Sequence, residues 1–477
     1  MSAFTTMPHH RSTHIARHWP TKWLLCTSLL AGCQGGSGND AASAPAPTPP
    51  PQYNTQLRLS LPDQGLRASQ LGLVVAQGDA LSEAVAAEYA RVRGVPPGNI
   101  VKVILPSTEQ SMSAADFAAI KAAVDAQLGA DVQATLITWA VPTRVQGEFC
   151  SVSITSAMAW GYDAKACVSS KAPSPCLSTR NSPYFGSEVQ RPFQEMGWRP
   201  SMLLGATSLE GARTLIQRGL QADGSQPSGT VYLVSTDDAM RNIRAADFHQ
   251  VTRQWLDSGL RTVLIDNAQG QANNSLSPRT DVLAYFTGLP QVSDLNAHQY
   301  RPGAVGDSLT SFAGLLPDAR GQTPATAWLD AGLTGTYGTV EEPCNFGGKF
   351  PKVSVLLDQY FRGASLIEAY WKSVDMPGQG LFIGDPLARP WPDNPSLEVV
   401  GNNYQLNTRR LRPNARYALE FRSASGDWKE LATIQPTSAA PKTWTLPLPP
   451  VDAVQIRWRG PCPLDLTQTC TLASSPS

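Results

Sequence analysis

Histidine is scarce over most of this 477-residue sequence. Four of the six His residues lie within the first 18 positions, so the rest of the chain holds only His249 and His298. Because His is the side chain that enzymes use most often as a general acid or base, this scarcity argues against His-dependent catalysis. Beyond residue 18 the sequence also lacks an HExxH motif, a CxxC motif and a closely spaced pair of His residues. We therefore expect no dedicated metal site, and we expect no cofactor.

An excess of charge of either sign is also missing. The chain has 38 basic and 38 acidic side chains, whereas a general nucleic-acid binder needs a basic surface to replace counterions. No 18 consecutive uncharged apolar residues occur, so we expect no classical membrane-spanning helix. Hydrophobic residues make up 42% of the chain and charged residues 16%, which is typical of a folded protein with sizeable cores. The length indicates two or three domains, and we expect no nucleic-acid partner.

The first 32 residues are typical of an export signal. Three basic residues precede a short apolar run at 23–30, and no acidic residue lies nearby. This run is too short to cross a bilayer as a stop-transfer helix. The residues Leu-Ala-Gly-Cys that follow end at Cys33 and resemble the lipobox of bacterial lipoproteins. The alternative is an ordinary signal peptide that is cut near Ala31 and leaves Cys33 as a spare thiol.

The lipobox resemblance implies that Cys33 is acylated and becomes the first residue of the mature chain. The acylated Cys33 would then attach the protein to the lipid bilayer as its partner. Gln34 follows, where an Asp would indicate retention in the inner membrane. We therefore predict a lipid-anchored protein of the cell envelope at the outer membrane, with the choice between periplasmic and surface leaflet left open. Residues 33–54, rich in Gly, Ser, Ala and Pro, predict an extended tether. Loss of the signal would leave 35 basic and 38 acidic side chains.

Export also predicts that the remaining cysteines lie in an oxidising compartment. Six cysteines are left once the signal is removed and Cys33 is acylated, which is consistent with three disulfides in any of 15 pairings. Cys462 and Cys470 are close in sequence and are expected to pair locally. The other four would form two bridges, one of them reaching the loop of Cys344. These four are Cys150, Cys167, Cys176 and Cys344.

Residues 55–395 are predicted to form one α/β domain. Continuous apolar runs alternate with helical patterns, as expected for a doubly wound, mostly parallel sheet of the caspase-like or flavodoxin-like kind. Residues 145–205, with three Cys and many Ser and Pro, break this pattern and are interpreted as a disulfide-stapled insertion. The expected strands are 71–76, 99–105, 134–140, 230–235, 261–266, 281–287, 335–340 and 381–384. Residues 396–477 instead contain short alternating segments and predict a small antiparallel β-domain.

Several separated motifs resemble an uncharacterised family of exported bacterial proteins. They include a strand, a helix that ends in a Tyr-Ala-x-x-Arg-Gly-Val-Pro run, and a closing Gly-Asp-Pro-Leu. The resemblance covers about residues 55–395 and implies no established activity. The motifs lie at 73–75, 89–90, 93–96, 99–101, 181–185, 237–238, 241–244 and 384–387.

A more distant similarity, over residues 305–391, is to the gingipain-like and caspase-like peptidase clan. In that clan a His loop follows one central strand and a nucleophilic Cys follows the next. Here Gly288 follows the first of these strands, and residues 310–314 read Thr-Ser-Phe-Ala-Gly where the nucleophile would stand. The similarity implies the fold, while both catalytic positions are substituted.

Catalysis would need other residues. Cys344 follows a predicted strand, and His298 or Glu342 could serve as its partner in a cysteine hydrolase. The alternative for Cys344 is a disulfide. Residues Gly306–Leu309 read Gly-Asp-Ser-Leu, the motif after which a group of lipases and esterases is named. No His follows His298 in the sequence to act as the base for the Ser of this motif.

Four charged residues are candidates for ligand binding. Asp237 and Asp238 follow a strand and could bind a cation or a sugar hydroxyl, and Arg244 belongs to the same motif. Helix capping is the alternative role for the two carboxylates. Asp385 ends the last strand, where a turn or a charge pair with Arg389 is the alternative. We predict a non-catalytic protein that binds a small molecule or a protein partner at the strand ends, with a divergent hydrolase using Cys344 and His298 as the alternative.

Overall fold

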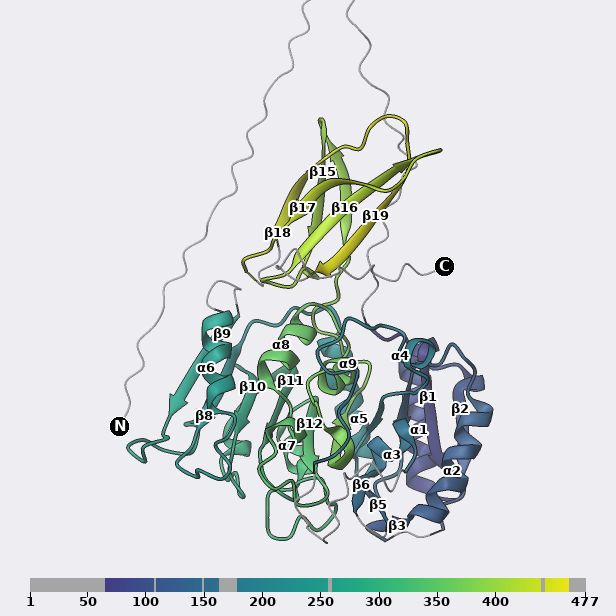
Figure 1. The fold of residues 1–477 in the computed structure, drawn as a ribbon. Coiled ribbons are helices and arrows are strands. Elements are labelled where there is room, and N and C mark those ends of the chain that lie inside the picture. The colour runs from purple at the N-terminus through teal and green to yellow at the C-terminus, as the bar shows by residue number, and fades with distance from the viewer. Residues whose placement is uncertain are drawn as a thin grey trace, which may run out of the picture. The chain divides into compact units, whose positions relative to one another are not determined.

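A ten-stranded, mostly parallel sheet forms the centre of the protein (Figure 1). The structure is a computed structural model that describes residues 65–106, 109–147, 150–162, 178–255, 260–438 and 442–462. The strand order is β2-β1-β4-β7-β13-β12-β11-β10-β8-β9. The strands are β1 (Leu71–Ala76), β2 (Ile100–Val103), β4 (Ala134–Ile137), β7 (Ser201–Leu203), β8 (Thr230–Ser235), β9 (Arg261–Asp266), β10 (Val282–Thr287), β11 (Tyr300–Ser308), β12 (Gly335–Thr339) and β13 (Gly380–Gly384). The predicted α/β class with a mostly parallel sheet is confirmed.

The segments that follow β2, β4 and β11 meet at one edge of the sheet, where β8, β10, β11 and β12 also end. Strands β2, β1, β4 and β7 are mutually parallel, as are β9, β8, β10, β11 and β12. Between these two groups, β13 is antiparallel to β12 and pairs with β7 through a parallel bridge between Ile383 and Leu203. Just beyond β2, the Gln110 side chain donates to the backbone oxygen of Asp318, which lies beyond β11. Just beyond β4, Thr143 accepts a hydrogen bond from the backbone nitrogen of Leu316 at 3.2 Å. We call this side of the sheet the carboxyl edge and the opposite side the amino edge.

Helices cover both faces of the sheet because successive side chains of each strand point to opposite sides. Val231 and Leu233 of β8 share a core with Phe248 of α6, whereas Tyr232 and Val234 share another core with residues of α7. This two-sided burial explains the continuous apolar runs of the sequence. The helices are α1 (Ala80–Arg93), α2 (Ala114–Gln127), α3 (Ile154–Trp160), α4 (Pro192–Met196), α5 (Leu209–Ala222), α6 (Ala245–Gln254), α7 (Ala325–Ala331), α8 (Val353–Phe361) and α9 (Leu366–Trp371).

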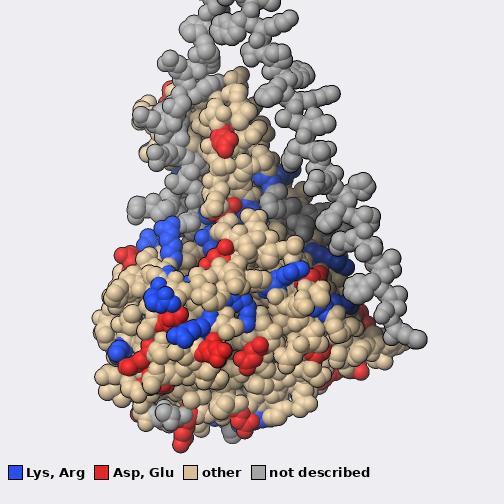
Figure 2. All heavy atoms as spheres, turned by 180° about the vertical axis from the view of Figure 1, so that it is seen from behind, with Lys and Arg blue, Asp and Glu red and all other residues tan. Residues whose placement is uncertain are grey.

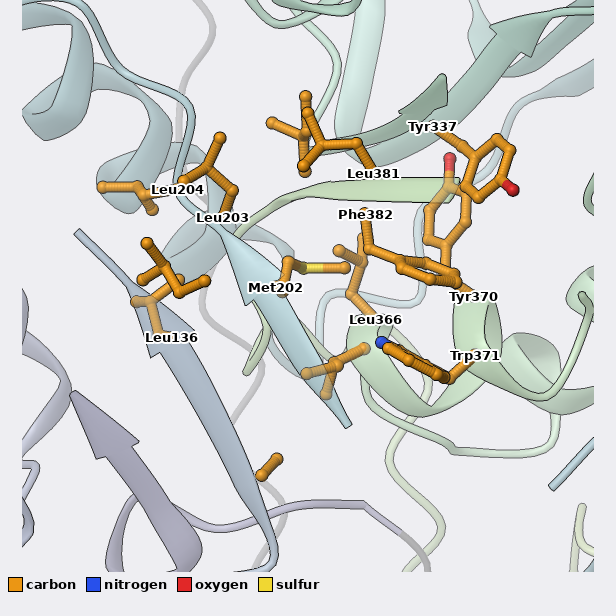
Figure 3. Close-up of a cluster of buried hydrophobic side chains, with 14 of the residues drawn as sticks. Leu136, Met202, Leu203, Leu204, Tyr337, Leu366, Tyr370, Trp371, Leu381 and Phe382 are labelled. Carbon is orange, nitrogen blue, oxygen red and sulfur yellow. The ribbon is translucent and has the colours of Figure 1, made fainter. Parts of the chain in front are cut away.

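Large side chains fill the space between the centre of the sheet and α9 (Figure 3). Trp371 of α9 stacks on Phe382 of β13, with ring centroids 4.4 Å apart and planes 16° from parallel. The indole nitrogen of Trp371 donates to the backbone oxygen of Ser201 in β7 at 2.8 Å, so the buried polar atom is satisfied. This packing fixes β13 and β7 in the middle of the sheet.

Residues 145–205 are not a separate insertion throughout, which corrects the sequence-based interpretation. Within the described part of this stretch, α3 lies between β4 and β7 in the chain and contacts both of them. Strand β7 pairs with β4 and occupies a central position in the sheet. Small strands β3 (Ser111–Ser113), β5 (Arg144–Gln146) and β6 (Ser151–Ser153) form an additional three-stranded sheet. Cys167 and Cys176 lie outside the described residues.

Two small antiparallel sheets follow the main body, as predicted from the alternating sequence. Their orders are β14-β15-β18 and β17-β16-β19. The strands are β14 (Ser396–Val400), β15 (Asn403–Thr408), β16 (Arg416–Ser423), β17 (Lys429–Ile434), β18 (Lys442–Pro447) and β19 (Ala453–Cys462). Leu406, Leu419 and Trp458 belong to one hydrophobic core that draws side chains from both sheets. Residues 52–477 form one compact unit.

The start of the described chain is attached to α9. Ser365 and Glu368 form a capping box at the beginning of this helix, in which the Glu368 carboxylate accepts from the Ser365 backbone nitrogen at 2.8 Å. The same carboxylate accepts a hydrogen bond from the backbone nitrogen of Leu66 at 3.1 Å. One buried acidic side chain therefore joins a helix start to a segment 302 residues away in sequence.

Candidate functional site

A buried ion pair lies beneath the carboxyl edge. Arg244, the residue before α6, places Nη2 2.7 Å from Oδ1 of Asp307 in β11 and donates from the same nitrogen to the backbone oxygen of Thr287. Both side chains are buried, and the Arg244 guanidinium lies against the rings of Phe248 and Phe286. Burial raises the pKa of Asp307 above its ordinary value, while Arg244 opposes that shift. Arg244, a predicted ligand residue, is thus used inside the protein.

The strand ends above this pair hold no nucleophile with a base. Ser308 is buried, donates to the backbone oxygen of Leu289 at 2.7 Å and accepts from the Leu289 backbone nitrogen. Thr310 accepts from the Nε of Arg241 and donates to the amide oxygen of Gln322. The hydroxyl groups at this edge therefore have structural hydrogen bonds, and none is paired with a His in the described part of the chain.

Asp237 and Asp238 lie at the carboxyl edge, where the sequence placed them. Asp238 accepts from the backbone nitrogens of Met240 and Arg241 and forms an ion pair with the Arg241 side chain at 2.8 Å. Asp237 is exposed and accepts from the Asn274 amide at 2.6 Å. Helix capping is not their role, because α6 begins only at Ala245. Asp238 stabilises a turn, and Asp237 bridges two loops.

Asp385 lies at the amino edge, away from the other three ligand candidates. It is fully buried, accepts from the hydroxyl of Tyr89 at 2.6 Å and forms an ion pair with Arg93. Arg93 also pairs with Asp223 at the end of α5. Burial raises the pKa of Tyr89 well above its ordinary value, and the neighbouring Asp385 charge adds to that shift. Asp385 is thus part of a network that joins α1, α5 and β13 inside the protein, and its role in a ligand site stays a prediction.

His298 and Cys344 are not brought together. His298 precedes β11 at the amino edge, where it is buried and accepts from the backbone nitrogen of Arg279 at 3.2 Å. Cys344 follows the end of β12, which runs parallel to β11, so it lies toward the carboxyl edge. A nine-residue strand spans roughly 30 Å. The alternative Cys344–His298 dyad therefore lacks its geometry.

Cys344 also belongs to a constrained loop. Its backbone φ is +52° and that of Asn345 is +59°, and the backbone nitrogen of Cys344 donates to the Glu342 carboxylate at 3.3 Å. Glu342 is thus used as a local acceptor. Cys150, Cys344 and Cys462 are disulfide-bonded. Their pairing stays a prediction, and Cys470 and Cys33 lie outside the described residues.

A hollow of about 500 Å³ opens between α6, α8 and the loop before β16. Its lining is polar, with basic, amide and hydroxyl side chains and a single acidic one. We call it the polar hollow. It is lined by Gly186, Gln250, Arg253, Gln254, Lys352, Ser354, Val355, Asp358, Arg412, Pro413, Asn414 and Thr437. No sequence pattern indicates this site, because its lining comes from segments that are far apart in the chain.

The acidic side chain of the polar hollow is already paired. The two carboxylate oxygens of Asp358 in α8 accept from Nε and Nη2 of Arg362 at 3.1 and 2.9 Å, respectively. One of these oxygens also lies 3.3 Å from Nε of Arg412. Arg412 also pairs with Glu188 at 2.8 Å. Burial alone would raise the pKa of Glu188, but Arg362 and Arg412 lower it. Arg253 and Lys352, in contrast, have no carboxylate within ion-pair distance among the described residues.

A second, smaller hollow of about 260 Å³ lies between α5 and α7. Its charged side chains are Glu210, Arg218 and Asp330. Arg218 donates to the backbone oxygens of Leu329 and Leu333 and is thereby committed to holding the end of α7. The acidic and basic groups here leave no unpaired positive charge for a ligand.

The surface and the comparisons with known proteins add little to this picture. Figure 2 shows basic and acidic side chains on neighbouring areas of the face opposite to the view of Figure 1. Among the described residues, no helix is long and apolar enough to cross a membrane, and no three His, Cys, Asp or Glu side chains are grouped to hold a metal ion. No protein-family model, curated protein or solved structure matches the chain. Function must therefore be argued from the geometry itself.

Proposed function

We propose that the protein is an extracytoplasmic, lipid-anchored binding protein without peptidase activity. Acylation of Cys33 would hold it at the outer membrane through the tether of residues 33–54, and its body would bind a small molecule or a protein partner. The motifs around Cys33 support the anchor. The finer description of the body as caspase-like is part of this proposal, and it is supported by the mixed sheet with β13 antiparallel to β12.

The observation that carries the proposal is the separation of the reactive side chains. His298 is buried at the amino edge, whereas Cys344 lies beyond β12. A nucleophile and its base must be within hydrogen-bond reach, or joined by one water, for general-base catalysis. The polar hollow, in contrast, has the volume of a small-molecule site and contains neither Cys nor His. Binding without catalysis is therefore the function that the geometry supports best.

Alkylation of the native protein tests the absence of a cysteine nucleophile. The protein is treated with iodoacetamide at neutral pH, before and after reduction, and peptides are analysed by mass spectrometry. We expect Cys344 to remain unlabelled until the protein is reduced, because a disulfide sulfur is not a thiolate. A Cys344→Ser variant identifies the peptide and serves as the control. Rapid labelling of Cys344 without reduction would favour the cysteine hydrolase instead.

A further inference from the structure

The polar hollow has an unbalanced charge. Among the residues that the structure describes, its lining includes Arg253, Lys352 and Arg412 but only one carboxylate, Asp358. Arg412 and Asp358 satisfy each other at 3.3 Å, so they contribute little attraction for a ligand. Arg253 at the end of α6 and Lys352 before α8 are exposed and have no ion-pair partner within the ranges that the structure describes. Two cationic side chains therefore line the hollow with no carboxylate paired to them.

The neighbouring acidic group does not cancel this charge. Glu188 pairs with Arg412 at 2.8 Å, and Asp247 of α6 accepts from both the backbone nitrogen and the hydroxyl of Ser354 at 3.2 and 2.5 Å. It thereby caps the start of α8, which reduces the positive end of that helix dipole. The attraction for an anion must then come from Arg253 and Lys352, which are the groups that an experiment should change.

The rest of the lining is suited to hydroxyl groups. Gln250, Gln254 and Asn414 each offer an amide donor and acceptor, and Thr437 offers a hydroxyl. The described residues of the lining include no aromatic side chain, so they provide no ring for stacking. A volume of about 500 Å³ is within the range that small-molecule sites occupy. The lining thus combines anion and polyol recognition.

We propose that the polar hollow binds a small hydroxylated anion, such as a sugar acid or a sugar phosphate. Arg253 and Lys352 bind the carboxylate or phosphate, while the amide and hydroxyl side chains bind the hydroxyl groups. This assignment rests on the proposed function as a binding protein. It goes beyond that function by naming the site and the chemical class of the ligand.

Isothermal titration calorimetry on the full chain in detergent tests the ligand class. Glucuronate and glucose 6-phosphate are the anionic probes, glucose is the neutral probe, and inorganic phosphate lacks the hydroxyl framework. We expect at least one of the anionic sugars to bind, with weaker binding as salt is raised from about 50 to about 500 mM because salt screens exposed charges. Preference between the two sugars distinguishes a carboxylate from a phosphate ligand. Equal binding of glucose, or binding of inorganic phosphate alone, would overturn the proposal.

Paired variants test the site. Arg253→Gln with Lys352→Gln removes both unpaired charges, and Arg91→Gln with Lys102→Gln removes two exposed charges from elsewhere on the surface. We expect the first double variant to weaken binding of the preferred anionic sugar about tenfold or more. The second should change it less than twofold. Unchanged binding in the first variant, or no binding of either sugar to the unaltered protein, refutes the assignment. Proteolytic activity would contradict the proposed function and is measured separately.

Discussion

Lys349 is a fully buried lysine near the carboxyl edge. It ends a short 3-10 helix at Gly347–Lys349, its ammonium lies 4.9 Å from the Phe346 ring centroid, and its backbone oxygen accepts from Tyr337. Burial lowers the pKa of Lys349 to about 8, although Glu342 and Glu341 oppose the shift. A lysine is seldom buried without such compensation. At neutral pH the folded protein thus holds a charge that burial penalises.

This burial predicts a pH dependence of stability. In the unfolded chain Lys349 stays protonated up to its ordinary pKa of 10.5, so unfolding between pH 8 and 10.5 takes up a proton. Stability from this residue therefore rises with pH in that window. Between pH 8 and about 9.5, we expect Lys349 to raise the free energy of unfolding of the unaltered protein by about 2 kcal/mol. The Lys349→Met variant should lack this rise. Urea unfolding at several pH values measures it.

Other residues titrate in the same range, so the comparison must be made between the two proteins. Burial also lowers the pKa of Lys372, which both proteins retain. A Lys102→Gln variant, altered at an exposed ion pair, should keep the dependence of the unaltered protein. Parallel stability curves for Lys349→Met and the unaltered protein would disprove the expectation.

The Arg244–Asp307 pair shows how residues typical of a ligand site can be structural. Arginine and aspartate beside strand ends are common in ligand sites, and sequence alone cannot say whether they face inward. Asp307 belongs to a strand whose neighbours are buried on both sides, and Arg244 reaches it from the start of α6. Removing one partner of such a pair leaves an unpaired buried charge, which is costly. We therefore interpret the pair as part of the core.

At the scale of elements, Arg362 connects α8 with the segment before the small β-sheets. Its side chain is fully buried and donates to Asp358, to Glu188 and to the backbone oxygen of Arg410. Three otherwise separate segments thus share one guanidinium. Because all of its donors serve carboxylates or carbonyls, its loss would leave buried acceptors without a donor.

We predict that Arg362→Met lowers the free energy of unfolding by about 3 kcal/mol. It should also speed the release of residues 396–477 in limited proteolysis, because the loop at Arg410 loses its donor. Arg457→Met is the matched control, since Arg457 pairs with Glu420 while 26% exposed and should cost at most about 1 kcal/mol. Thermal unfolding and timed digestion measure both effects. Equal losses in the two variants would contradict a special role for Arg362.

Sequence patterns located eight of the ten strands of the central sheet but missed β7 and β11, and they also missed the small sheet of β3, β5 and β6. Strands β8 and β9 match their expected ranges of 230–235 and 261–266. Strand β7 has only three residues and lies within a segment rich in Ser, Pro and Cys, so no periodicity marks it. Strand β11 contains Pro302, Gly303 and Gly306, which ordinarily disfavour strands. Pairing with β10 and β12 overrides these local preferences.

At the scale of the whole molecule, the sequence predicted the fold class but not the candidate site. Apolar strand segments that alternate with helical patterns indicate a parallel sheet locally in the sequence. The polar hollow instead depends on how α6, α8 and the loop of Arg412 meet. The four ligand candidates follow strands in the sequence, yet Asp385 lies at the edge opposite to Asp237 because β13 is antiparallel to β12. The direction of a strand determines at which edge of the sheet the residue after it lies, and a single sequence does not reveal that direction.

The lipid anchor is tested on the whole cell. We predict that a Cys33→Ala variant no longer fractionates with membranes, because a protein held only by its acyl chains loses its membrane affinity without them. Membrane and soluble fractions are compared by immunoblot, and a Cys26→Ala variant, altered inside the predicted signal, is the control. Membrane association of the Cys33→Ala protein equal to that of the control would argue against acylation.

The hydrogen bond between Leu66 and Glu368 has a mechanical consequence for an anchored protein. Tension on a tether that precedes residue 65 would reach Leu66, whose backbone nitrogen donates to the Glu368 carboxylate at the start of α9. That helix packs through Trp371 on the centre of the sheet. The load would then reach the centre of the sheet through α9 as well as through β1, which begins at Leu71. Under pulling force, the body should resist unfolding until the hydrogen bond between Leu66 and Glu368 breaks.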